Sequence, residues 1–213
     1  PTWGTPDYFN RCSRHKADVP KNFAGKEEAV DGDGYAGFIP VGLQYFFRAK
    51  ASNIGHSREY ISTKLTQKLT KDSLYCISFF ISQGDYSYIR IDELGLYFSY
   101  WRIRSPFNQK ELNKEPQILF NGLISCPRNG WLQLKRVFKA TGHERYMTIG
   151  VFQTDKEVNW VDKGDALKRE SFVKDKSDMS EAYYYIDKVE LRPLSDPECP
   201  CRQGSGANTL SPE

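Results

Sequence analysis

Leu74-Tyr-Cys-Ile-Ser-Phe-Phe-Ile81 is a stretch in which apolar side chains occupy both odd and even positions. Successive side chains of a β-strand point to opposite faces, so a strand with this pattern is apolar on both faces. A short apolar run bounded by turn residues is typical of a fully buried strand. Thr70-Lys-Asp-Ser73 supplies the turn that leads into it. The stretch therefore predicts a long buried strand at the centre of a β structure.

A period of two recurs through most of the chain outside this strand. Apolar residues alternate with others over 61–65, 94–98, 132–140, 147–151 and 183–191, and shorter candidates lie at 34–40 and 117–120. No stretch has a sustained helical period, and the best helical candidate, 165–174, lies in a charged insertion (162–181) that we expect to be a solvated loop. About eight strands with turn signals between them predict an all-β fold, a two-sheet β-sandwich jelly roll.

The C-terminal part has a different composition. Pro, Gly and Ser dominate from Pro193 onward. Such segments do not bury a core, so residues 193–213 are predicted to be a linker or disordered tail, with the binding domain in residues 1–192. A linker would imply a further domain beyond Glu213.

Bulk composition excludes some classes of protein. The 213 residues carry 30 basic and 27 acidic side chains, a net charge of only +3. Nucleic-acid-binding proteins usually have a clustered basic excess, so we expect no nucleic acid partner. No apolar run reaches the length of roughly 18 residues that a membrane-spanning helix needs. The aromatic content of 14% favours both strands and flat binding surfaces.

Five cysteines leave the disulfide pairing undetermined. Cys76 lies inside the buried strand, where we expect a free thiol. Cys12, Cys126, Cys199 and Cys201 lie in turn-like contexts that suit disulfides in an oxidising compartment. The Cys199-Pro-Cys201 spacing is too tight for an ordinary zinc knuckle.

Motifs of catalysis are missing from the chain. The three histidines are scattered in polar contexts, and there is no nucleophile elbow or phosphate-binding loop. Adjacent carboxylates such as Asp92-Glu93 point to opposite faces of a strand and cannot flank one bond. We therefore expect a noncatalytic protein, although a glycosidase built from distant carboxylates stays open.

Aromatic residues beside turns are the best candidates for ligand binding. Sugars present C–H faces that stack on aromatic rings, and arginine side chains can bind their hydroxyl groups. We predict stacking by Tyr35, Trp101 and Trp160 and hydroxyl contacts by Arg58 and Arg102.

Asp187 lies within the last predicted strand, on the parity of Val189 and Leu191. A carboxylate that leans into a core needs a partner, because a bare buried charge is costly. A calcium ion, a cluster of backbone amides or an arginine would each suffice. Asp187 is therefore also a candidate metal ligand.

Seven segments, in order and spacing, resemble a known family. They are Gly4–Asn10, Gly32–Gly37, Arg58–Ile61, Leu74–Phe80, Ile91–Ser99, Tyr146–Phe152 and the closing strand Tyr183–Leu191. The chain resembles galactose-binding-like jelly rolls, which include carbohydrate-binding modules. More specifically, it resembles an extracellular domain of Bacteroidetes cell-envelope proteins that is often joined to an outer-membrane-protein-A-like domain.

The resemblance implies a location and partners. It implies an extracellular position, at the cell surface or the periplasmic face of the outer membrane, and a peptidoglycan link through a C-terminal domain. Family members begin with an Asn-Pro-x-Phe-Glu strand whose Glu joins the closing-strand Asp in a structural calcium site. That strand is absent here, which puts calcium at Asp187 in doubt.

Two functions follow from these observations. The first is a noncatalytic recognition module that binds glycan through loop aromatics. The second is a protein–protein interaction subunit of a surface secretion or gliding-motility assembly, in which the sheet edge left by the absent first strand would accept a strand from an envelope protein.

Overall fold

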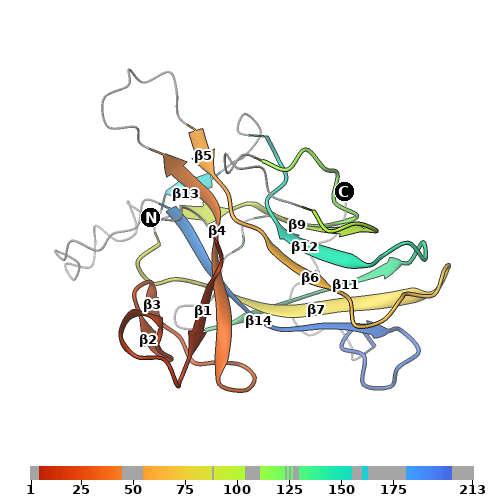
Figure 1. Ribbon diagram of the computed structural model, residues 1–213, viewed down its shortest axis with the longest axis horizontal. Coiled ribbons are helices and arrows are strands. Elements are labelled where there is room, and N and C mark those ends of the chain that lie inside the picture. Colours follow the sequence, from red (N-terminus) through yellow and green to blue (C-terminus); the bar gives the residue numbers. More distant parts are fainter. Residues whose placement is uncertain are drawn as a thin grey trace.

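Two antiparallel sheets form the body of the protein. The computed structural model describes residues 5–44, 55–87, 89–103, 111–122, 124, 126, 130–154, 160–162 and 181–202. The first sheet has the strand order β1-β4-β14-β7-β11, with β5 pairing on β4, and the second has the order β10-β9-β12-β6. Figure 1 shows β7 and β14 side by side, with β9 and β12 in the layer above them. This arrangement confirms the predicted all-β sandwich.

The first sheet consists of β1 (Asp7–Asn10), β4 (Gly34–Gln44), β5 (Gly55–Ser57), β7 (Leu74–Gln83), β11 (Leu132–Lys139) and β14 (Glu181–Pro193). The second consists of β6 (Ile61–Lys64), β9 (Glu93–Ser99), β10 (Ile118–Asn121) and β12 (Tyr146–Gly150). Two short ribbons pair β2 (Lys21–Asn22) with β3 (Gly25–Lys26), and β8 (Ile89–Ile91) with β13 (Trp160–Asp162); η1 (His15–Ala17) is a single 3₁₀ turn. All eight strands expected from the period of two are present. The strands that the sequence did not predict are short.

The main core lies between the two sheets. Residues 77, 79 and 81 of β7 face it, and the Phe79 ring meets the Phe120 ring of β10 edge-on at 5.6 Å. From the second sheet, β9 and β12 contribute Leu94, Leu96 and Ile149, all fully buried. Burial of each such side chain contributes roughly 1.5–3 kcal/mol. This core is the main force that holds one sheet on the other.

The opposite face of β7 is also buried, as its apolar pattern predicts. Near one end of the strand, the Ser82 hydroxyl donates to the Glu27 carboxylate at 2.5 Å. Near the other end, Cys76 forms a disulfide with Cys201. Segments from both termini therefore cover the outer face of the first sheet. A second apolar cluster around Phe9 packs under the N-terminal segment.

The closing strand β14 changes face part-way along. Lys188 has a φ of 48°, and the pairing register with β7 shifts between Asp187 and Glu190. A bulge of this kind reverses the alternation of side chains. Before the bulge, Tyr185 faces the second apolar cluster, whereas Leu191, which has the same parity, packs against the main core after it. The prediction that one parity serves the whole strand is therefore wrong.

The chain beyond Pro193 folds back on β7. The Leu194 amide donates to the Leu74 carbonyl at 2.9 Å, Cys199 is buried, and Cys201 is bonded to Cys76. Packed structure thus extends to Arg202, beyond the predicted domain end at residue 192. The expectation that Cys76 is a free thiol is wrong, because a partner distant in sequence reaches it. Residues 203–213 and most of the charged insertion lie outside the described residues.

Candidate functional site

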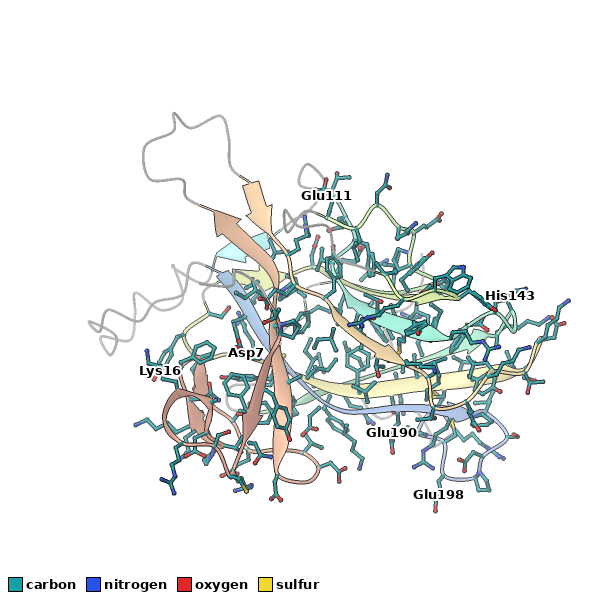
Figure 2. The ribbon with its side chains drawn as sticks, viewed as in Figure 1. Asp7, Lys16, Glu111, His143, Glu190 and Glu198 are labelled. Carbon is teal, nitrogen blue, oxygen red and sulfur yellow. A yellow bond between two sulfur atoms is a disulfide. The ribbon has the colours of Figure 1, made fainter. Side chains whose placement is uncertain are left out.

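A surface groove of about 810 Å³ opens where the ends of β9 and β11 come together. Its walls are the end of β9 with the loop after it, the residues just before β10, and the turn between β11 and β12. Residues of both sheets therefore line it. In Figure 2, His143 marks this end of the molecule, opposite Lys16 and the N-terminal ribbons. We call this feature the aromatic groove.

Two aromatic side chains stand at its surface. Trp101 is 77% exposed and Tyr100 is 48% exposed, and their rings meet edge-on with centroids 4.7 Å apart. The Ser99 hydroxyl donates to the Trp101 carbonyl at 2.8 Å. The Arg145 guanidinium lies 5.8 Å from the centre of the Tyr100 ring, within range of a cation–π interaction. The two rings are thus held by the loop and by Arg145 while remaining accessible to a ligand.

The floor of the groove is apolar and fixed. Phe98 and Phe138 stack with ring centroids 4.6 Å apart, which joins β9 to β11. The Gln117 side chain accepts from the Phe98 amide at 2.7 Å and donates to the Phe98 carbonyl at 3.2 Å. Val137 is 38% exposed and adds apolar area. An extended apolar floor under exposed rings is suited to a ligand with C–H faces.

The charged side chains of the groove are mainly basic. Arg102 and Lys114 line it, and among the described residues no carboxylate pairs with either. Lys139 also lines it but forms an ion pair with Asp72 at 2.9 Å. The free cations give the groove a local positive charge that the net charge of the chain does not reveal.

Glu144 is the one carboxylate among the described lining residues, and it stabilises the β11–β12 turn. It accepts hydrogen bonds from the Thr141 amide (2.7 Å), the Thr141 hydroxyl (2.8 Å) and the Gly142 amide (2.9 Å). Burial opposes its ionisation, but these hydrogen bonds outweigh burial and lower the pKa of the carboxyl. Glu144 therefore holds the turn rigid as a carboxylate at neutral pH.

Two of the predicted ligand-binding residues are buried elsewhere. Tyr35 is 2% exposed, and its hydroxyl donates to the Glu27 carbonyl and accepts from the Asn22 amide. Arg58 is 1% exposed. Neither can stack on or bind a ligand at the surface, so both predictions are wrong. A turn precedes Tyr35, but this residue already belongs to β4 and its side chain points into the second apolar cluster.

The other three predicted positions have different outcomes. Trp101 and Arg102 both line the aromatic groove. The side chain of Trp160 lies outside the described residues. Lys114 and His143 were missed, because they come from separate turns that only the packing of the two sheets brings beside Trp101.

The Asp187 carboxylate is surrounded by backbone amides. One of its oxygens accepts from the amides of Val30 (2.7 Å) and Asp31 (3.2 Å), and the other accepts from the Lys188 amide (2.7 Å). A calcium ion would need further oxygen ligands around the Asp187 carboxylate, but backbone N–H groups occupy the space beside both carboxylate oxygens. This arrangement does not fit a calcium site. Within the described part of the chain, Asp187 belongs to no group of three or more potential metal ligands. The amide cluster accounts for its burial.

No family model matches the chain, and no curated protein matches it. Among solved structures, the K1 cleaved adhesin domain of Lys-gingipain from Porphyromonas gingivalis is 12% identical, covers 90% of this chain and 85% of its own, and has a TM-score of 0.43. A xylan-binding domain from Paenibacillus barcinonensis is 11% identical, with coverage of 88% and 86% and a TM-score of 0.39. A cyclase from Fischerella is 11% identical, with coverage of 87% and 71% and a TM-score of 0.37. Likenesses as low as these carry no argument about function.

No helix in the described part of the chain is long and apolar enough to cross a membrane.

Proposed function

We propose that the protein is a noncatalytic recognition module that binds glycan chains in the aromatic groove. The observation that carries the proposal is the pair of exposed rings, Tyr100 and Trp101, held above an apolar floor. Large exposed aromatics give a soluble monomer no benefit in folding, so a cluster of them is typical of a binding surface.

The rings and the cations suit one class of sugar. A pyranose ring has an apolar face of C–H groups that can lie flat on an indole. Arg102 and Lys114 have no carboxylate partner within the described residues and can pair with a carboxylate on the same sugar. We therefore propose glycans that contain uronic acids as the preferred ligands.

The setting that we propose is the bacterial cell surface. The disulfide between Cys76 and Cys201 suits an oxidising compartment. The motifs that resemble Bacteroidetes envelope domains support a position at the outside of the cell or on the periplasmic face of the outer membrane. A glycan is the partner that the groove favours in this setting.

Affinity electrophoresis against a panel of plant and envelope polysaccharides tests the proposal. We expect polygalacturonate to retard the protein more than neutral xylan does, and salt to weaken the interaction because exposed charges are screened. Replacement of Trp101 by alanine should cost about 2 kcal/mol of binding, roughly a 30-fold loss of affinity. Tyr8→Ala is the matched control, because Tyr8 is 66% exposed on β1, outside the groove. Absence of binding to every polysaccharide, or equal losses in the two variants, would refute the proposal.

A protein partner is the competing outcome. In the structure, β1 pairs with β4 through four residues and forms one edge of the first sheet, where a strand from a partner could add. A stoichiometric envelope protein recovered with the wild type and with Trp101→Ala alike, together with no glycan binding, would favour the interaction subunit.

A further inference from the structure

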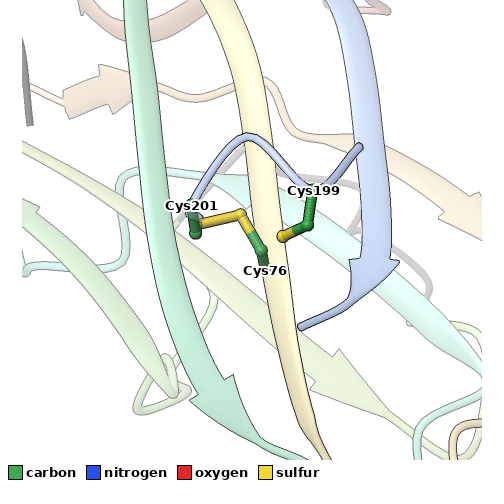
Figure 3. Close-up of side chains that lie close together, drawn as sticks. All are labelled: Cys76, Cys199 and Cys201. Carbon is green, nitrogen blue, oxygen red and sulfur yellow. A yellow bond between two sulfur atoms is a disulfide. The ribbon is translucent and has the colours of Figure 1, made fainter. Parts of the chain in front are cut away.

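Three cysteines lie together on the outer face of β7, away from the aromatic groove. The sulfur atoms of Cys76, Cys199 and Cys201 all lie within 4.8 Å of one another. Cys76 and Cys201 form a disulfide with a Cα–Cα distance of 5.9 Å, and Cys199 is a fully buried free thiol. Figure 3 shows Cys199 and Cys201 on the two sides of Cys76, with the Cys199 side chain pointing towards Cys76. A free thiol is thus placed beside a disulfide that it can attack.

The segment that carries Cys199 and Cys201 does not depend on sulfur alone for its position. Four other contacts attach or brace it: the Leu194 amide to the Leu74 carbonyl (2.9 Å), Lys135 Nζ to the Pro200 carbonyl (3.0 Å), and Arg192 to the carboxylates of Asp196 (3.3 Å) and Glu198 (3.3 Å). These contacts keep both cysteines against Cys76 when the disulfide opens. Reacting groups held in this way have a high effective concentration.

We propose that the three cysteines form a thiol–disulfide exchange site, in which Cys76 pairs with either Cys201 or Cys199 and the released Cys201 couples to a disulfide-bearing partner. This inference does not depend on glycan binding. It assigns a chemical role to a buried thiol that the disulfide leaves unpaired.

The exchange is balanced without an external oxidant or reductant. Cys199 loses its proton to solvent, and its sulfur attacks Cys76 Sγ. The Cys76–Cys199 bond forms as the Cys76–Cys201 bond breaks, and the electron pair of the broken bond leaves on Cys201 Sγ. Attack on Cys201 instead would join two residues separated only by Pro200. That pairing would leave the segment without its bond to β7.

Exchange moves the free thiol from a buried position to an accessible one. Cys199 is 0% exposed, whereas Cys201 is partly exposed and lines a surface depression of about 950 Å³. Leu74, Pro193 and Arg202 line the same depression. The released Cys201 thiolate can attack an incoming disulfide there, forming a mixed disulfide and releasing one thiolate of the partner. The positive charge of Arg202 favours an anionic disulfide, so oxidised glutathione is a suitable probe.

The first test uses oxidised glutathione that is free of thiol and peptide mapping under non-reducing conditions. Cys12 is exposed and would take up glutathione itself, so the protein carries Cys12→Ala. We expect a glutathione adduct on the Cys201 peptide together with a Cys76–Cys199 disulfide. The further variant Cys199→Ala should lose the adduct, because the remaining thiol, Cys126, does not belong to the cluster and no thiol beside the disulfide is left to open it. No adduct on Cys201 in the Cys12→Ala protein, or equal adducts with and without Cys199, would overturn the proposal.

The second test asks whether Cys199 can pair with Cys76 at all. The Cys201→Ala protein is oxidised in air, unfolded and treated with iodoacetamide. We expect Cys76 and Cys199 to be protected as a disulfide, whereas Cys12 and Cys126 are alkylated. Alkylation of both Cys76 and Cys199 would show that the two do not pair and would contradict the exchange. The glutathione test stays decisive if this variant folds poorly.

Discussion

Removal of both partners of Cys76, by the double variant Cys199→Ala/Cys201→Ala, should lower the free energy of unfolding by about 5 kcal/mol. The disulfide joins residues 125 positions apart. In the chain-entropy account, closure of a loop of this length restricts the unfolded chain by roughly 16 cal/mol/K, which is about 5 kcal/mol at room temperature. For a domain of this size, the loss corresponds to a decrease of roughly 10–20 °C in Tm.

Urea unfolding followed by tryptophan fluorescence without reductant measures this loss. The matched control is Cys199→Ala alone, which keeps the bond between Cys76 and Cys201 and removes only a buried thiol. Cys12→Ala, at an exposed position, should change stability by no more than about 0.5 kcal/mol. If the double variant unfolds within about 1 kcal/mol of the single variant, the covalent bond does not hold the segment on β7. Our account of that face would then be refuted.

Three further changes test other parts of the fold. Hydrogen bonds hold the pKa of Glu144 below its ordinary value of 4.5, so the wild type should be more stable than Glu144→Gln above that pH. This difference in the free energy of unfolding should vanish as the pH falls through the lowered pKa, and urea unfolding from pH 7 to pH 3 measures it. Gly37→Ala should destabilise the fold by about 1–3 kcal/mol, because a Cβ there would collide with the Tyr183 hydroxyl; an unchanged Tm would contradict this packing. Asp187→Ala should cost about 1–3 kcal/mol by leaving the Val30 amide without its acceptor, and the loss should be the same with calcium or with a chelator present. Stabilisation of wild type alone by calcium would instead favour a metal site.

The strands were predictable because their signal is local. The continuous apolar run of β7 and the alternation along β9 and β12 depend only on neighbouring residues, and burial of both faces or of one face of a sheet imposes these patterns directly. The short ribbons β2–β3 and β8–β13 have too few residues to show a period. The bulge at Lys188 could not be predicted from alternation, because it belongs to the pairing of β14 with β7, a strand that is distant in the sequence.

The candidate site was predictable only in part. Trp101 and Arg102 follow a strong strand directly, so a loop position for both was visible in the chain. Tyr35 follows a similar turn signal, yet its side chain points into the second cluster, since the face that a strand residue occupies depends on what covers each side of the sheet. Lys114 joins these residues through packing of segments that are far apart in the sequence.

The cysteines show most clearly which features follow from the local sequence and which depend on tertiary contacts. The number of cysteines and their turn-like contexts indicated an oxidising compartment, and the apolar run around Cys76 indicated a buried strand. Which cysteine reaches Cys76 depends on how the segment after β14 folds back across the sheet. Alternation and composition are properties of neighbouring residues, and the amino-acid order determines them. Pairing, the choice of face and the assembly of the groove depend on contacts between distant segments, and only the folded chain brings those together.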